Sequence, residues 1–109
     1  MDLKRGDIWW INLDPAQGSE IKKTRPGVIL TVNALNKARR TVVIVPLSSQ
    51  AQPRPPIVVA TSSAGDNSVA VCDQIRTVDK ARLIEKIGSL SKSDMTDVSA
   101  GVKQILGLS

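Results

Sequence analysis

Arg25 is the residue of this sequence best suited to chemistry on a phosphate. It closes a polar segment, residues 14–25, and precedes Pro26, whose ring restricts the residue before it to an extended backbone. A guanidinium oriented in this way offers a planar fork of donors that matches two phosphate oxygens. The alternative is a surface ion pair with Glu20 of the same segment. Arg25 therefore predicts either phosphate chemistry or a structural ion pair.

The amino-acid composition excludes several kinds of catalytic site. The sequence has no His and one Cys, so it lacks the commonest acid–base group and cannot build a thiolate cage for zinc. A reaction would have to use Arg, Lys, carboxylates and hydroxyls, which suits phosphodiester cleavage. RNA supplies its own nucleophile, the 2′-hydroxyl, so its cleavage requires neither a metal nor a covalent intermediate. We expect no metal and no cofactor.

Positive charge is concentrated in the first half of the chain. Fifteen Lys and Arg against ten Asp and Glu give a net charge of +5; residues 1–54 hold nine cations and four carboxylates, and residues 55–109 hold six of each. Between residues 21 and 65 there is no carboxylate, and the cations there are Lys22, Lys23, Arg25, Lys37, Arg39, Arg40 and Arg54. If this stretch folds back on itself, it forms one positive face that would bind nucleic acid.

Length and composition indicate one folded domain over residues 1–109. Hydrophobic residues make up 41% of the sequence and charged residues 23%, a balance typical of globular domains. A single Cys excludes an internal disulfide, and no long apolar stretch follows the N-terminus. We therefore expect a cytoplasmic protein that does not enter a membrane.

Most of the chain up to residue 72 is predicted to form β-strands. Residues 7–13 are rich in β-formers, and because successive side chains of a strand point to opposite faces, Trp9 and Trp10 cannot both enter one core. One of them is expected at a groove or interface, or else in half-exposed packing. Further strands are predicted over residues 27–32, 41–47, 57–60 and 68–72, with a helical turn at 33–39 and an extended Pro-rich link at 52–56. This spacing predicts a small antiparallel barrel.

The C-terminal part of the chain is predicted to be mainly helical. A short helix is expected over residues 78–86, then a strand or link over 87–90, and then a final helix with Ser91 as its N-cap. The apolar stripe of that helix consists of Met95, Val98, Val102, Ile105 and Leu106. Gly101 within the helix is expected to cost about 1 kcal/mol relative to Ala.

Six segments carry a resemblance to a known family. They are Lys4-Arg5-Gly6-Asp7-Ile8-Trp9-Trp10, Asp14-Pro15, Gly18-Ser19-Glu20, Thr24-Arg25-Pro26-Gly27-Val28-Ile29-Leu30, Val45-Pro46-Leu47-Ser48-Ser49-Gln50 and Cys72-Asp73-Gln74-Ile75-Arg76-Thr77-Val78-Asp79. Together they resemble the MazF/PemK family of toxin endoribonucleases, in family order and over nearly the whole chain. The resemblance implies a mainly β fold with C-terminal helices, an SH3-like barrel of the MazF/Kid/CcdB type, in a homodimer. It also implies cleavage of single-stranded RNA, chiefly mRNA, and inhibition by a cognate antitoxin.

By the same resemblance, three residues form the catalytic set. Arg25 matches the catalytic Arg of the family, Ser48 matches a hydroxyl position that is usually Thr, and Glu20 matches a loop carboxylate. Arg25 would stabilise the phosphorane, and Ser48 would donate to a non-bridging oxygen, with Ser49 as a neighbouring alternative. If Ser48 has no such role, it merely ends a strand. Glu20 would either accept the 2′-hydroxyl proton or hold Arg25 in place.

The expected RNA-binding residues surround this set. Asp73 matches an Asp that the Kid branch is proposed to use with an Arg and a His, but Val71 stands at the Arg position and no His exists. We therefore expect Asp73 and Gln74 to read base edges. Cys72 beside them is expected to be a small buried hydrophobic residue. The remaining expected RNA contacts are Lys22, Lys23, Ser49, Gln50, Arg54 and Arg76.

Two other functions remain open. A gyrase poison of the CcdB type would share the barrel, but its C-terminal Trp-Gly-Ile is absent from the last residues, 104–109. An inactive RNA-binding module would keep the basic residues and lose the Arg-Pro or hydroxyl position, whereas Arg25 and Ser48 are both present. These two alternatives are tested by RNA cleavage.

Overall fold

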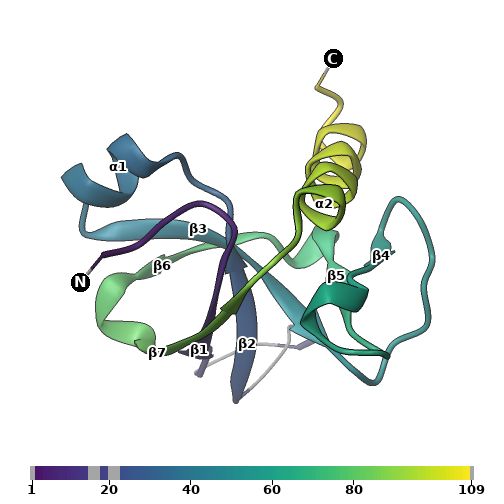
Figure 1. The fold of residues 1–109 in the computed structure, drawn as a ribbon, viewed down its shortest axis with the longest axis horizontal. Coiled ribbons are helices and arrows are strands. Elements are labelled where there is room, and N and C mark those ends of the chain that lie inside the picture. The colour runs from purple at the N-terminus through teal and green to yellow at the C-terminus, as the bar shows by residue number, and fades with distance from the viewer. Residues whose placement is uncertain (1, 15–17, 20–22, 109) are drawn as a thin grey trace.

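The computed structural model describes residues 2–14, 18–19 and 23–108. The strands are β1 (Asp7–Asn12), β2 (Thr24–Ile29), β3 (Thr41–Ser48), β4 (Val58–Ala60), β5 (Val69–Val71), β6 (Arg76–Asp79) and β7 (Leu83–Ser89). The α-helices are α1 (Asn33–Ala38) and α2 (Lys92–Ile105), and single 3₁₀ turns occur at η1 (Ser62–Ala64), η2 (Cys72–Gln74) and η3 (Lys80–Arg82). Figure 1 shows the strands curving around one another, with α2 on one side.

The central strand of the sheet is β3. It pairs with β2 along one edge and with β6 and then β5 along the other, and the order β4-β5-β3-β2-β1-β7 completes the sheet. All of these pairs are antiparallel. The prediction of a mainly β antiparallel fold with helical structure at the C-terminus is confirmed.

Alternating side chains fill two hydrophobic cores on opposite faces of this sheet. On β1, Ile8 belongs to the core beneath α2, whereas Trp9 and Ile11 belong to the second core. On β3, Val45 belongs to the core beneath α2 and Ile44 belongs to the second core. A strand buried on both faces explains why the predicted strands read as continuous runs of Val and Ile. The prediction that only one Trp is buried is also confirmed, because Trp9 is 9% exposed and Trp10 is 37% exposed.

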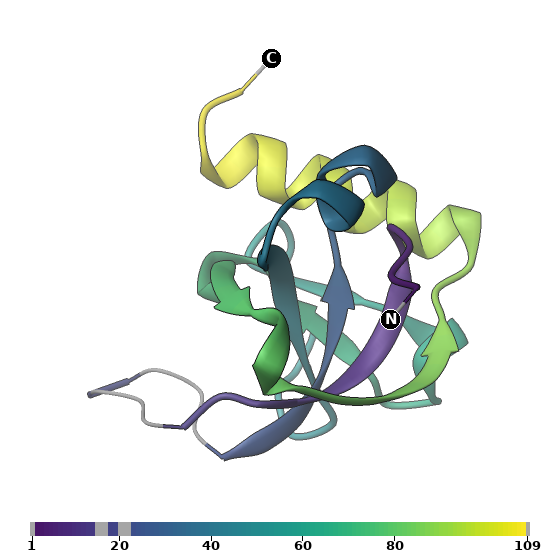
Figure 2. The same cartoon turned by 90° about the vertical axis from the view of Figure 1, so that its left-hand side faces the viewer.

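Helix α2 lies across one end of the strands (Figure 2). Its predicted N-cap is confirmed, since the Ser91 hydroxyl accepts from the Asp94 N–H at 3.1 Å. Val98 and Val102 are buried in the core, but Leu106 is 53% exposed and falls at the C-cap, so the predicted stripe is one residue too long. Among the described helices, none is long and apolar enough to cross a membrane.

Gly101 is required by packing. A Cβ built there would lie 2.9 Å from the Pro56 carbonyl oxygen and 3.2 Å from the Cys72 sulfur. Both distances are shorter than ordinary van der Waals contacts, so α2 approaches the β4 and η2 region closely only because this residue is glycine. The helix-propensity cost expected from the sequence is therefore accompanied by a packing gain.

The predicted helix over residues 78–86 is wrong. The segment forms the end of β6, the turn η3 and most of β7. Asp79 caps only one 3₁₀ turn, accepting from the Ala81 N–H at 2.8 Å, and pairing of β6 with β3 and of β7 with β1 takes the flanking residues into the sheet. Sheet pairing thus overrides a weak helical pattern, and α2 is the one α-helix of the described C-terminal part.

The described cations of the basic stretch lie toward both ends of β3 and not in one cluster. Gly27 pairs with Pro46 and Ile29 with Ile44, so the start of β2 lies beside the end of β3. Arg25 is therefore near the Ser48 end of β3. The cations of residues 37–40 lie at α1 and at the opposite end of this eight-residue strand. An extended strand of that length keeps the two groups more than 20 Å apart, on the order of 3.3 Å per residue.

Candidate active-site cavity

A cavity of about 590 Å³ opens where the start of β2 meets the end of β3. Its floor is apolar, with Ile8 and Leu47 from the core beneath α2. The other lining residues are Trp10, residues 24–26, 48–49 and 63–68, and residues 87–89 of β7. We call residues 24–26, 48 and 49 the β2–β3 wall, and residues 63–68 the η1 wall.

The β2–β3 wall carries Arg25. Its backbone is extended, as Pro26 predicts, and it belongs to β2 rather than to the preceding loop, where it pairs with Ile11 of β1. Within the described part of the chain, the guanidinium has no hydrogen-bond or ion-pair partner. A half-buried guanidinium that no described residue contacts in this way is suited to bind an anion in the cavity.

Ser48 and Ser49 stand beside Arg25 on the same wall. The Ser48 hydroxyl accepts a hydrogen bond from the Gln50 N–H at 3.0 Å. This contact fixes the oxygen through one lone pair and leaves the hydroxyl proton free to be donated. Ser48 can therefore act as a hydrogen-bond donor to an oxygen bound in the cavity.

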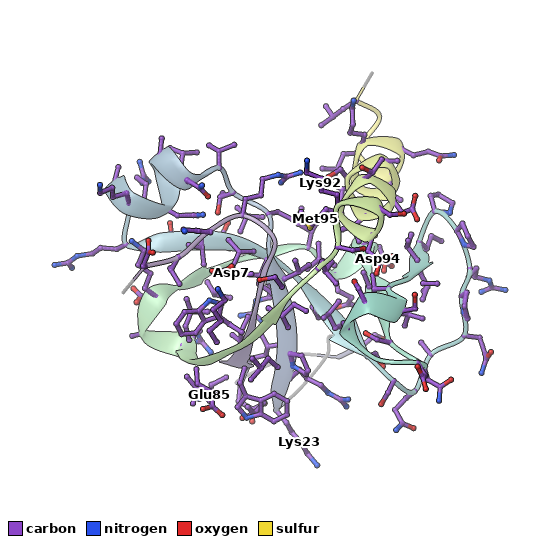
Figure 3. All side chains as sticks on the ribbon, in the orientation of Figure 1. Asp7, Lys23, Glu85, Lys92, Asp94 and Met95 are labelled. Carbon is purple, nitrogen blue, oxygen red and sulfur yellow. The ribbon has the colours of Figure 1, made fainter. Side chains whose placement is uncertain are left out.

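The η1 wall is the connection between β4 and β5, and it is held to the start of α2. The Asp94 carboxylate, 9% exposed, accepts from the Ser63 N–H at 2.9 Å and also from the Ser63 hydroxyl. The Ser63 hydroxyl oxygen in turn accepts from the Ser91 N–H at 3.0 Å. Figure 3 shows Asp94 at the first turn of α2, on the side that faces η1. These contacts position the η1 wall opposite Arg25.

Sequence reasoning missed the η1 wall, although it anticipated the role of one Trp. Trp10 lines the cavity with its exposed ring, whereas Trp9 is in the core. The contact between Ser63 and Asp94 spans 31 residues, so no local pattern announced it. Gly65, which adopts φ of 140°, and the Asp66-Asn67 pair after it are residue types that favour a turn, and they are the local signal that could have indicated one.

Other predicted site residues lie elsewhere. Lys23 has left-handed φ of 68°, and its N–H donates to the Asp14 carboxylate at 2.6 Å; Figure 3 shows its side chain beyond the tip of β2. Arg76 donates to the Leu13 carbonyl at 3.3 Å. The residues predicted to bind RNA that do not line this cavity are Lys23, Gln50, Arg54, Asp73, Gln74 and Arg76. Glu20 and Lys22 lie outside the described residues.

Cys72 is a buried core residue, as predicted. It belongs to the core beneath α2 and is 0% exposed. Burial, with a smaller effect from the Asp73 carboxylate, raises the pKa of its thiol from 9.0 to about 11. The thiol is therefore protonated at neutral pH and is not a nucleophile.

Comparison with known proteins identifies the family. Residues 4–106 match the model of the PemK-like, MazF-like toxins of type II toxin–antitoxin systems. The chain belongs to this family. Endoribonuclease PemK of Escherichia coli is 36% identical over 110 residues, covering 96% of this chain and 83% of that protein. Endoribonuclease MazF9 of Mycobacterium tuberculosis is 30% identical over 115 residues, covering 97% and 98%.

Solved structures of MazF proteins share the fold. The crystal structure of MazF from Deinococcus radiodurans superposes with a TM-score of 0.85 at 23% identity, covering 99% of both chains. A mycobacterial endoribonuclease in complex with its cognate antitoxin superposes with a TM-score of 0.80 at 22% identity, covering 98% of this chain and 97% of that one. The architecture described above is therefore the MazF fold.

Proposed function

We propose that this MazF-type toxin is an endoribonuclease that cleaves single-stranded RNA in the cavity between the β2–β3 wall and the η1 wall. The observation that carries the proposal is the convergence above an apolar floor of a donor hydroxyl, Ser48, and the Arg25 guanidinium, which has no partner among the described residues. Family membership and the endoribonuclease relatives support the same activity. Single-stranded RNA suits the site because its bases are unstacked and can enter a cavity.

The reaction uses the nucleophile of the substrate. The 2′-hydroxyl loses its proton as its oxygen bonds to the adjacent phosphorus, and the bond from phosphorus to the 5′ oxygen breaks. The 5′ oxygen gains a proton, so the products carry a 2′,3′-cyclic phosphate and a 5′-hydroxyl. Because the nucleophile belongs to the RNA, the protein has to align it and stabilise the phosphorane, and the step requires no metal or cofactor.

The residues of the β2–β3 wall supply that stabilisation. The Arg25 guanidinium would donate two hydrogen bonds to non-bridging oxygens, where charge accumulates in the transition state. The Ser48 hydroxyl, oriented by the Gln50 N–H, would donate a third, and Ser49 is the neighbouring alternative donor. The Trp10 ring offers a stacking surface for a base next to the scissile bond.

The other predicted contacts would extend the RNA path beyond the cavity. Lys23 and Arg54 are exposed cations that suit phosphates, and Asp73, Gln74 and Gln50 carry groups that suit base edges. Lys22 and Arg76 complete the proposed phosphate contacts. Glu20 would accept the 2′-hydroxyl proton or position Arg25.

We also propose that the protein is a homodimer and that a cognate antitoxin neutralises it. A small domain buries only part of its apolar surface, and Ile84, Ile87 and Trp10 remain exposed here, which supports a protein partner. A solved relative was captured with its cognate antitoxin. An acidic segment that folds across the cavity would displace RNA through charge and burial. The main cellular consequence would be inhibition of translation and growth.

The proposal is tested with purified protein and a long single-stranded RNA in excess EDTA. Wild-type protein should cut at discrete positions and leave cyclic-phosphate and 5′-hydroxyl ends. Arg25→Ala should leave the RNA intact, whereas Arg39→Ala, which removes an exposed Arg at the far end of β3, should cut normally. RNA that stays intact with wild-type protein would contradict the proposal and favour a gyrase poison or an inactive RNA-binding module.

A further inference from the structure

The η1 wall differs chemically from the wall that it faces. Asp66 is the one carboxylate among the described residues that line the cavity, and Asn67 beside it carries an amide. Neither side chain has a hydrogen-bond or ion-pair partner within the described part of the chain. Both are exposed. The wall therefore presents to the cavity polar groups that no described residue contacts in this way.

The backbone beneath these groups is well fixed. The Thr61 N–H donates to the Ser68 carbonyl at 2.9 Å, and the Ser68 N–H donates to the Gly65 carbonyl at 3.0 Å. Asp94 holds Ser63 to α2, as described above. Polar side chains on a fixed backbone, without partners of their own, are suited to recognition because little order has to be gained on binding.

The position of Asp66 relative to Arg25 assigns it to a base and not to the phosphate. Ser48 pairs with Val69, so the η1 wall joins the β2–β3 wall at the point where the phosphate would bind. A carboxylate beside a phosphate is repelled, whereas the Arg25 guanidinium attracts it. The phosphate therefore binds the β2–β3 wall, and the adjoining base faces Asp66.

A carboxylate accepts hydrogen bonds and donates none. Exocyclic amino groups, which donate, are present on cytosine, adenine and guanine and absent from uracil. The donor of uracil, N3–H, lies between two carbonyl oxygens, which repel a carboxylate. We propose that Asp66 is a specificity-determining residue that selects a base with an exocyclic amino group at one nucleotide beside the scissile phosphate. This inference rests on the proposed RNA cleavage and adds to it which group reads the base.

The test maps cleavage sites of wild-type protein, Asp66→Asn and the matched control Asp97→Asn on one RNA library with randomised sequence. Asp97 is an exposed carboxylate on α2 that lines a different hollow, so its loss changes the net charge equally. At one position beside the cut, wild type and Asp97→Asn should exclude uracil by about tenfold, as a good base contact does. Asp66→Asn should admit uracil there, because its amide also donates.

The outcomes separate the two proposals. Cleavage by Asp66→Asn with the same base distribution as wild type would overturn the role of Asp66 and leave the proposed activity standing. Wild-type sites that admit uracil at every position beside the cut would also overturn it. No cleavage by wild type would overturn both proposals. Circular dichroism and thermal unfolding should be unchanged in Asp66→Asn, because its side chain is exposed and without a partner among the described residues.

Discussion

The two walls of the cavity are built by different means. The β2–β3 wall is part of the sheet, where β2 pairs with β1 on one side and with β3 on the other. The η1 wall is a hairpin connection, and side-chain contacts between Ser63, Asp94 and Ser91 hold it to α2. A wall made of main-chain ladders tolerates most side-chain changes without moving. The η1 wall has main-chain hydrogen bonds of its own, but its attachment to α2 depends on the Ser63 and Asp94 side chains and can be weakened by one substitution.

This difference suits the two tasks that we assign to the walls. Phosphate chemistry needs Arg25 and Ser48 at fixed positions, which the sheet provides. Base selection can vary with the side chains of a connecting segment without disturbing the chemistry. Substitutions in one wall should therefore change its own task and spare that of the other.

The largest effect is expected for Arg25. Arg25→Ala should lower the rate of RNA cleavage by about 10³-fold, because it removes the paired donors to the phosphorane. Arg25→Lys should recover only part of the rate, since an ammonium keeps the charge and loses the planar fork. Single-turnover cleavage of one oligonucleotide measures both. Equal rates for Arg25→Lys and wild type would show that charge alone is required.

The second largest loss of cleavage rate is expected for substitutions of Ser48. Ser48→Ala should lower the cleavage rate by about 10²-fold, as expected for the loss of one transition-state donor. Ser48→Thr should retain the wild-type rate or exceed it, because the methyl group restricts the rotamer of the same hydroxyl. If Ser49→Ala proves the slower variant under the same conditions, the donor is Ser49.

Substitution of Asp94 should weaken the η1 wall and leave the β2–β3 wall unchanged. Asp94→Ala leaves the Ser63 N–H and hydroxyl without their acceptor, so urea unfolding should show a loss of about 1–3 kcal/mol. Cleavage should continue with relaxed base selection, and KM should change more than kcat. The exposed Asp97→Ala is the matched control on the same helix and should alter neither property. A loss of kcat as large as that of Arg25→Ala would mean that the walls are not independent.

Gly101 tests the packing of α2 against Pro56 and Cys72, outside both walls. Helix propensity alone predicts that Gly101→Ala stabilises the protein by about 1 kcal/mol. The Pro56 carbonyl at 2.9 Å from the added Cβ predicts the reverse, a loss of about 1–3 kcal/mol measured by urea unfolding. Ser93→Ala, an exposed change on the same helix, should show the propensity gain without the loss. Stabilisation by Gly101→Ala would contradict the close approach.

The smallest effect belongs to Cys72, which lies outside both walls. Because its pKa is raised from 9.0 to about 11, the folded state keeps its proton while the unfolded state loses it. The stabilisation is present below pH 9 and is lost as the pH rises toward 11. Urea unfolding from pH 8 to 11 should show this decline, and Cys72→Ala should show less of it. An identical slope in both proteins would contradict the burial of the thiol.

Local sequence patterns predicted the sheet and half of the cavity. Strong β-formers marked β1 and β3, and the Arg25-Pro26 pair specified an extended backbone at the residue that the cavity uses. The helix predicted over residues 78–86 was wrong because pairing with distant strands determines the structure of this segment. The η1 wall was not predicted for a similar reason, since Ser63 and Asp94 come into contact only in the folded chain.

The cations of the basic stretch show the same limit at a larger scale. Charge along a sequence does not specify distance in space, and the eight residues of β3 separate Arg39 and Arg40 from Arg25. The family resemblance, in contrast, covered nearly the whole chain and was confirmed, because ordered motifs carry information about tertiary contacts that local pattern lacks.

The most direct test of the account uses one oligonucleotide that spans a mapped cleavage site. A single 2′-deoxy substitution at the scissile nucleotide removes the proposed nucleophile and changes nothing else in the phosphate chain. If the RNA supplies the nucleophile, wild-type protein in EDTA should leave this oligonucleotide intact and should cut the all-ribose version to a 2′,3′-cyclic phosphate. Cleavage of the deoxy-substituted oligonucleotide at the same bond would contradict the central claim, because a nucleophile other than the RNA's own would then be at work.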